Sequence, residues 1–234
     1  DVITTIEPDV QSFLEKKLIE VSEKYQADTI GGIIMNPGDG SLYALASLPN
    51  FDPNDFSKIK TASIFGNPLV ENVLEFGSVV KPLNMASALD AGAVTAHTIY
   101  NDKGSVIVEK KEIFNFDKKG RGPGTTMQEV LNQSLNTGMV FVEQKLGKEK
   151  LKSYLLSYGI KDKTGIDLPN ETSGLVSNLN SPREIEYANA SFGQGIAQTP
   201  IEIVRALASL ANGGNLVVPH VASKIKYNDG TYKT

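Results

Sequence analysis

The sequence predicts an α/β fold in which strand-forming segments at both ends of the chain bracket a mostly helical middle. Two observations lead to this class. Strand-like runs with turn residues occupy the two ends, and helices with recognisable caps fill the middle. We expect an α/β part at residues 1–60 and 197–234, an all-helical part at residues 61–196, and an antiparallel sheet flanked by helices.

The N-terminal α/β part is predicted from three successive elements. Residues 2–6 are strand-like, and residues 8–26 have apolar side chains with a period of 3.6, as expected for an amphipathic helix. Two further strand-like runs, 29–35 and 41–46, flank the turn residues 36–40. This pattern indicates a β-hairpin.

The middle of the chain contains capped helices. Gly77 precedes the first helix, and Gly92 follows it in a position where glycine commonly ends a helix. The threonines at 125–126, followed by Gln128 or Glu129, indicate a capping box. We expect helices over residues 78–91, from about 126 to 133, 137–146 and 148–158.

The C-terminal part begins with a second capping box, Thr199-Pro200-Ile201-Glu202, whose helix is expected to end at residues 212–214. Strand character returns over 216–227. The basic, Gly-rich stretch Lys118–Gly124 is typical of a solvated loop. Because the chain opens without Met and stops soon after a hairpin-like turn, we expect it to be part of a longer protein and to lack the last strands of its domain.

Composition excludes several classes of function. A hydrophobic content of 40% and a charged content of 21% predict a packed core. The net charge of -4 argues against nucleic-acid binding, which needs a concentrated basic surface. Cysteine is absent, which excludes disulfides, a Cys nucleophile and thiolate zinc sites.

Ser78 and Lys81 are the first candidate catalytic residues. Side chains three residues apart lie on one helix face, about 5–6 Å apart at Cβ. A helix N-terminus offers free N–H groups that stabilise a developing oxyanion. Burial lowers the pKa of a lysine and so allows it to act as a base. The pair therefore has the arrangement of a serine nucleophile with a proton acceptor.

The Ser-x-x-Lys pattern alone is weak, because it occurs three times in the chain. Only the second match opens an apolar helix behind a glycine. The third lies in a strand-like segment, where residues three apart point to opposite faces. The matches are Ser57/Lys60, Ser78/Lys81 and Ser223/Lys226.

Ser134-Leu135-Asn136 is the only Ser-x-Asn sequence in the chain, and it lies between two predicted helices. The Ser134 hydroxyl could relay a proton between the lysine and a leaving group, and Asn136 could hold a substrate amide. A polar cap at a helix junction is the structural alternative.

These motifs and their order resemble the transpeptidase domain of class B penicillin-binding proteins over nearly the whole chain. The segments that resemble the family are VITTIEPDVQSFLE, IIMNPGDGSLYALASLPNFDPNDF, GSVVKP, QSLNTG, KTGIDLPNE, SFGQGIAQTPIEIVRALASLANGG and VVPH.

The resemblance implies the penicillin-binding transpeptidase fold and D,D-transpeptidation of peptidoglycan stem peptides ending in D-Ala-D-Ala. It implies that Ser78 is the nucleophile, Lys81 its proton acceptor, Ser134 a proton relay and Asn136 a substrate-binding residue. β-Lactams would acylate Ser78. No metal or cofactor is implied. The full-length protein would lie at the extracytoplasmic face of the cell membrane, with other cell-wall synthesis proteins as partners.

The chain departs from the family at Phe76, usually Pro, and at Val80, often aromatic. The family's third motif, Lys-Thr/Ser-Gly, is also missing from its usual place. Lys163-Thr164-Gly165 has the letters but follows Asn136 too closely, so we expect a structural role for it. Lys233-Thr234 could be the start of a truncated motif, but it lies too close to Pro219. We expect the real motif beyond residue 234 and poor acylation by this chain alone.

Other functions remain as alternatives. A serine β-lactamase would need a deacylating glutamate, for which Glu171 is the nearest candidate, although a surface loop position is expected for it. A β-lactam-binding sensor and an inactive scaffold are two further alternatives, but the intact motifs weigh against degeneracy. A Ser-His-Asp hydrolase is disfavoured, because His97 and His220 are expected to be surface residues and no Gly-x-Ser-x-Gly sequence occurs. No metal-ligand spacing is found.

Overall fold

The computed structural model describes residues 1–59 and 61–233 and contains two compact units, each considered by itself. Within the described residues, no helix combines the length and apolar character that a membrane span requires. The α/β unit comprises Asp1–Val73, Asp162–Ser173 and Thr199–Thr234, and the helical unit comprises Leu74–Lys161 and Gly174–Gln198.

The α/β unit contains five strands and five helices or 3₁₀ turns among its described residues. The pair β2–β3 is an antiparallel hairpin, and β8 pairs antiparallel with both β1 and β9. The elements are β1 (Val2–Thr4), α1 (Pro8–Tyr25), β2 (Ile30–Met35), β3 (Leu42–Leu48), η1 (Phe56–Lys58), η2 (Ala62–Phe65), α2 (Pro68–Glu71), α8 (Pro200–Ser209), β8 (Ala222–Lys226) and β9 (Tyr232–Lys233).

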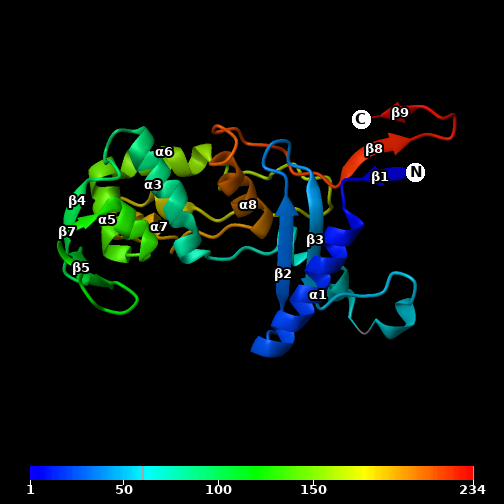
Figure 1. The fold of residues 1–234 in the computed structure, drawn as a ribbon, viewed down its shortest axis with the longest axis horizontal. Coiled ribbons are helices and arrows are strands. Elements are labelled where there is room, and N and C mark those ends of the chain that lie inside the picture. Colours follow the sequence, from blue (N-terminus) through cyan, green and yellow to red (C-terminus); the bar gives the residue numbers. More distant parts are fainter. Residues whose placement is uncertain (60, 234) are drawn as a thin grey trace. The chain divides into compact units, whose positions relative to one another are not determined.

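Helices cover both faces of the β2–β3 hairpin. Successive residues of a strand point to opposite faces, and the space beside Gly31 is filled by Leu69 of α2, whereas that beside Gly32 is filled by Leu14 of α1. Figure 1 shows α1 lying along β2 and β3. The predicted antiparallel sheet flanked by helices is therefore present, and two adjacent glycines allow both helices to approach it closely.

The core of this unit joins segments that lie far apart in the sequence. Leu42, Val70, Ile166 and Ile201 pack together and are all buried. Helix α8 begins with the predicted capping box, in which Thr199 and Glu202 bond to each other's backbone N–H groups. Segments 61–73 and 162–173, which the sequence placed in the helical part, belong to the α/β unit.

The helical unit also contains strands. Strand β4 pairs with β7, and β5 pairs with β6 as a hairpin, so the prediction of an all-helical middle was wrong. Its elements are η3 (Gly77–Val80), α3 (Lys81–Asp90), β4 (Ile99–Asp102), β5 (Ser105–Val108), β6 (Lys111–Phe114), β7 (Gly122–Thr126), α4 (Met127–Asn132), α5 (Asn136–Leu146), α6 (Lys148–Ser157), η4 (Ser177–Asn180) and α7 (Glu184–Ser191).

Three further boundaries differ from the prediction. The helix expected from Ser78 begins as the 3₁₀ turn η3 and becomes α-helical at Lys81. The stretch Lys118–Gly124, expected to be a loop, ends in the first residues of β7. Of the strand expected over 216–227, only β8 is formed.

Helix α5 is the centre of the helical unit. Helix α3 packs against α5 and α6, and α7 packs against α5 on another side (Figure 1). Helix α4 precedes α5 and has the predicted capping box, formed by Thr126 and Glu129. The fold thus brings the start of α3 and the α4–α5 junction, more than fifty residues apart in the sequence, to one place.

Candidate active site

Ser78 lies on η3, directly before α3, in a turn fixed by close backbone contact. The preceding residue, Gly77, has a φ of +54°, and its N–H donates to the Gly193 carbonyl at 3.2 Å. The Ser78 side chain is exposed and has no hydrogen-bond partner among the described residues, whereas Val80 is fully buried. The turn therefore holds the Ser78 hydroxyl at the surface, on a backbone segment that is fixed by its contacts.

Lys81 is the most unusual residue of the site, because it is a lysine with only 2% of its surface exposed. Its Nζ donates to the Ser134 carbonyl at 2.7 Å, to Ser134 Oγ at 3.0 Å and to Asn136 Oδ1 at 2.7 Å. The structure thus brings together three of the four predicted site residues directly. Ser78 lies one turn away on the same segment.

Burial lowers the pKa of Lys81 to about 8. Removing an ammonium from water disfavours its charged form, and all three of its hydrogen-bond acceptors are neutral. A lysine with this pKa is partly neutral near physiological pH. It can therefore accept a proton from a nearby hydroxyl and return it.

Ser134 occupies the junction between α4 and α5 in a left-handed conformation, with a φ of +53°. A residue other than glycine, asparagine or aspartate adopts this conformation at some energetic cost, and such strain is concentrated at functional sites. The Ser134 N–H donates to the Leu131 carbonyl at the end of α4. This conformation allows both the carbonyl and the hydroxyl of Ser134 to contact the Lys81 amine.

Asn136 is the first residue of α5, and its side-chain amide is anchored on two sides. Its Oδ1 accepts from Lys81, and its Nδ2 donates to the Phe114 carbonyl at the end of β6 at 2.9 Å. An amide nitrogen carries two hydrogens. The second one remains available for a substrate carbonyl.

A buried network that sequence reasoning missed holds the start of α5. Asp102, 1% exposed, accepts hydrogen bonds from the Thr137 hydroxyl at 2.8 Å, the Asn115 side chain at 3.0 Å and the Arg121 N–H at 3.0 Å. Asn115 in turn accepts from the Thr137 N–H at 3.2 Å. Asp102 belongs to no motif, and Thr137 lies in the QSLNTG segment but was assigned no role there. The capping box that starts α4 was the only local sign that this region is tightly held.

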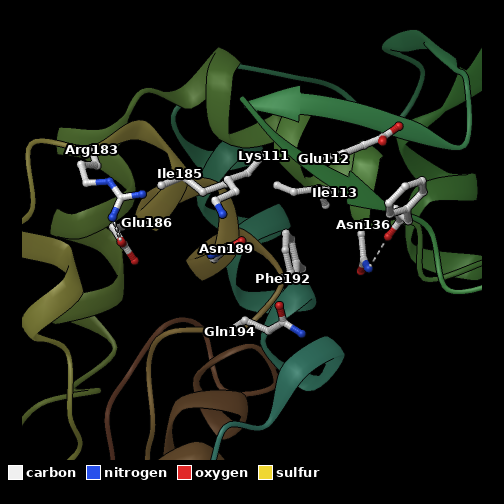
Figure 2. A pocket seen from close by; sticks show the side chains of 11 residues that line it. Lys111, Glu112, Ile113, Asn136, Arg183, Ile185, Glu186, Asn189, Phe192 and Gln194 are labelled. Atoms are coloured by element: carbon white, nitrogen blue, oxygen red, sulfur yellow. Dashed lines mark hydrogen bonds and ion pairs between the residues drawn. The ribbon is translucent and has the colours of Figure 1, made fainter. Parts of the chain in front are cut away.

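A cavity of about 420 Å³ adjoins Asn136. Its walls come from β6, α7 and the segment that follows α7 (Figure 2). Phe192, 4% exposed, forms part of its lining beside Asn136. The cavity therefore extends the candidate site along the helical unit.

Lys163-Thr164-Gly165 is held in place by hydrogen bonds to a nearby glutamate. The segment lies in a loop, and Glu171 accepts hydrogen bonds from the Thr164 N–H and hydroxyl, both at 2.6 Å, and from the Gly165 N–H at 3.1 Å. Glu171 is 9% exposed, so the expectation of a surface position for it was wrong. Both carboxylate oxygens stabilise this loop.

The remaining candidates fall outside the site. Ser57 donates to Asp55, and Ser223 of β8 donates to the Ile3 carbonyl. His97 is exposed, and His220 Nδ1 lies 3.0 Å from the Val218 carbonyl. Among the described residues, no group of three His, Cys, Asp or Glu side chains could hold a metal. Lys60 and Thr234 lie outside the described residues.

The chain is similar to known proteins in sequence and in fold. A family model described as the penicillin binding protein transpeptidase domain matches residues 30–234. Stage V sporulation protein D of Bacillus subtilis is 34% identical over 96% of this chain and 35% of its own length. A peptidoglycan D,D-transpeptidase FtsI homolog of Mesostigma viride is 30% identical over 93% of this chain and 38% of its own length.

The fold is shared with solved structures. The crystal structure of penicillin binding protein 3 from Mycobacterium tuberculosis, complexed with aztreonam, has a TM-score of 0.92 and 24% identity, and the match covers 99% of this chain and 52% of that one. At this identity the likeness shows the fold. The chain spans about a third of the length of the curated relatives named above.

Proposed function

Because this chain belongs to the penicillin-binding protein transpeptidase domain family, we propose that it supplies the nucleophile and the proton acceptor of a peptidoglycan D,D-transpeptidase. In this proposal Ser78 forms an acyl-enzyme with stem peptides ending in D-Ala-D-Ala, and β-lactams acylate the same hydroxyl. The observation that carries the proposal is the buried Lys81 amine, which contacts Ser134 and Asn136 and lies one turn from Ser78.

The acylation step follows from the positions of these groups. Ser78 Oγ attacks the carbonyl carbon of the bond between the two terminal alanines, and its proton moves to the neutral Lys81 amine. When the C–N bond breaks, the Ser134 hydroxyl, 3.0 Å from Lys81 Nζ, passes a proton to the leaving D-alanine amine. An amine of a second stem peptide then attacks the ester, and the Ser78 hydroxyl is restored.

Substrate binding is assigned to Asn136. Its free amide hydrogen would donate to a carbonyl of the donor peptide, while its other contacts fix the side chain against β6 and Lys81. A hydrogen-bond donor that is already aligned before the reaction stabilises the transition state more than a mobile donor does, because little reorganisation is needed.

The family also suggests where the protein acts. Peptidoglycan lies outside the cell membrane, so the full-length protein is proposed to work at the extracytoplasmic face, with stem peptides as substrates and other cell-wall synthesis proteins as partners. The relative in Bacillus subtilis is named for sporulation and that in Mesostigma viride for D,D-transpeptidation. The sequence features of this chain fit either setting.

The first test is covalent labelling of the full-length protein by a fluorescent penicillin, followed by intact-mass measurement and peptide mapping. The wild type should gain one penicillin adduct on the peptide that contains Ser78, and Ser78→Ala should gain none. Ser223→Ala, which removes the serine of another Ser-x-x-Lys match, is the matched control and should label normally. Labelling that persists in Ser78→Ala would contradict the proposed nucleophile, and an unlabelled wild type would favour a scaffold.

Hydrolysis of the acyl-enzyme, as in a β-lactamase, is less well supported. The nearest candidate for a deacylating base, Glu171, has both oxygens bonded to Thr164 and Gly165. The penicillin adduct should therefore persist over many minutes in the mass measurement. Its rapid loss would favour the β-lactamase alternative.

A further inference from the structure

The cavity beside Asn136 contains polar groups that the proposed chemistry does not use. It is lined by β6 on one side and by α7 and the segment after it on the other (Figure 2). Its apolar surface comes from Ile113, Ile185 and Phe192, each less than 10% exposed. A concave surface with buried apolar walls and a few polar groups is the usual form of a binding site.

The two basic residues of the cavity differ in their pairing. Arg183 is already matched, with Nη1 3.3 Å from Glu186 Oε1 and Nε 3.6 Å from Glu109 Oε2. Lys111 has no ion-pair or hydrogen-bond partner among the described residues. In Figure 2 its amine is directed into the cavity, on the side where Asn189 lies. Lys111 is therefore the unmatched positive charge of this cavity.

The neighbouring acidic residue does not neutralise this charge. Glu112 also lines the cavity, but it follows Lys111 on β6, where successive strand residues point to opposite faces. In Figure 2 the Glu112 carboxylate is directed away from the Lys111 amine. Ile113, two residues after Lys111, shares its face of the strand and lines the same cavity.

Two side-chain amides are also free to bind a ligand. The amides of Asn189, on α7, and Gln194 line the cavity and form no side-chain hydrogen bond with any described residue. A primary amide can both donate and accept, which suits the N–H and C=O groups of a peptide backbone. The free groups of the cavity thus match an extended peptide that carries a carboxylate.

We propose that this cavity binds the part of the donor stem peptide that precedes the two terminal alanines, and that Lys111 pairs with a carboxylate of that part. The inference rests on the proposed function, in which Asn136 binds the donor amide next to the attacked bond. Because Asn136 also lines the cavity, the peptide segment adjoining that amide enters it. Ile113 and Phe192 contact its aliphatic atoms, and Asn189 and Gln194 bond to its backbone.

The test uses the full-length protein and two synthetic donor peptides ending in D-Ala-D-Ala. The peptides differ at one position, where the carboxylate preceding the alanines is free in one and amidated in the other. For the wild type, kcat/KM for D-alanine release should favour the free carboxylate. Lys111→Met should lower kcat/KM for this peptide about fivefold, which is the effect expected from losing one partly exposed ion pair. It should also abolish the preference for the free carboxylate. Lys111→Arg should restore most of it.

Lys150→Met is the matched control, because Lys150 is an exposed lysine of α6 that does not line the cavity. It should leave the preference between the two peptides unchanged. A preference that persists in Lys111→Met would overturn the subsite, while penicillin labelling of the wild type would still support the proposed function. A wild type that is neither labelled nor active on either peptide would refute both.

Discussion

Lys81 combines two opposing effects in one residue. Its three hydrogen bonds to neutral acceptors suit an ammonium, whereas burial disfavours the charge and lowers the pKa to about 8. Near that pH the two protonation states are of similar free energy. A base that must take a proton from a serine and then return it works best in this range.

This pKa predicts the pH dependence of acylation. Because only neutral Lys81 accepts the Ser78 proton, the second-order rate constant for penicillin acylation should rise about tenfold per pH unit below about pH 8 and level off above it. Stopped-flow acylation of the full-length protein from pH 6 to 10 measures this profile. A rate that is flat below pH 8 would contradict the role of Lys81.

Asn136→Asp should move the same profile. A carboxylate in place of the Asn136 amide would lie beside the Lys81 amine, whose Nζ is 2.7 Å from Oδ1. An opposite charge at this distance stabilises the ammonium and raises its pKa by roughly 1–3 units. The inflection should move to higher pH by that amount, whereas in Asn136→Ala it should not move upward. An unshifted Asn136→Asp profile would show that another group controls the rate.

Residue-level sequence reasoning could propose Ser78, Lys81, Ser134 and Asn136 because each belongs to a short motif. It could not find Asp102 or the role of Thr137, since their importance comes from a contact between segments that are not adjacent in the chain. The left-handed conformation of Ser134 was also out of reach, because serine carries no strong preference for it.

At the scale of elements, the turn before Ser78 depends on the loop after α7. The Gly193 Cα lies so close to the Gly77 backbone that a Cβ there would collide with the Gly77 carbonyl oxygen. Gly193 also has a φ of +82°, which favours glycine. These two glycines let two backbones meet and fix the orientation of η3.

Gly193→Ala should therefore slow acylation and not only lower stability. Gly147→Ala is the matched control, because Gly147 has a similar φ of +84° but open space where a Cβ would be. Strain at such positions costs roughly 1–3 kcal/mol, so both variants should melt at lower temperature. Only Gly193→Ala should lose penicillin acylation, by tenfold or more. Equal acylation by the two variants would show that the Gly77–Gly193 contact does not position Ser78.

The elements that the sequence predicted are those with local signals. The capping boxes of α4 and α8 and the turn of the β2–β3 hairpin were found because adjacent residues define them. Strands β4–β7 were missed, since they are only four or five residues long, carry several charges and contain glycines in β7. Asp102 of β4 bonds to Asn115, just after β6, and to Arg121, just before β7, and no local pattern shows these contacts.

For the whole molecule, the family and the α/β class were predicted correctly. Helix α5, which begins at Asn136, also carries a second unusual ionisable group. Glu143 of α5 is 3% exposed. Burial, together with the charge of Glu184, raises the pKa of Glu143 from 4.5 to about 7, while Lys148 partly opposes this. The folded protein thus holds this proton more tightly than the unfolded chain does.

This difference predicts how stability changes with pH. For Glu143, the stabilising contribution is complete below about pH 4.5 and is lost as the pH rises through about 7, because the folded state must then bury a charge. Glu143→Gln, which stays neutral, should therefore raise the melting temperature at pH 8 but not at pH 5. The difference in unfolding free energy at pH 8 is up to about 3 kcal/mol.

Glu149→Gln provides the comparison, because Glu149 is exposed on α6 and one residue from Lys148. It removes the same charge from the surface of the same unit and should change the melting temperature little at either pH. If Glu143→Gln and Glu149→Gln behave alike at pH 8, Glu143 is solvated in the folded protein. If only Glu143→Gln stabilises at pH 8, the cost of a buried charge in α5 limits the stability of the helix that carries Asn136.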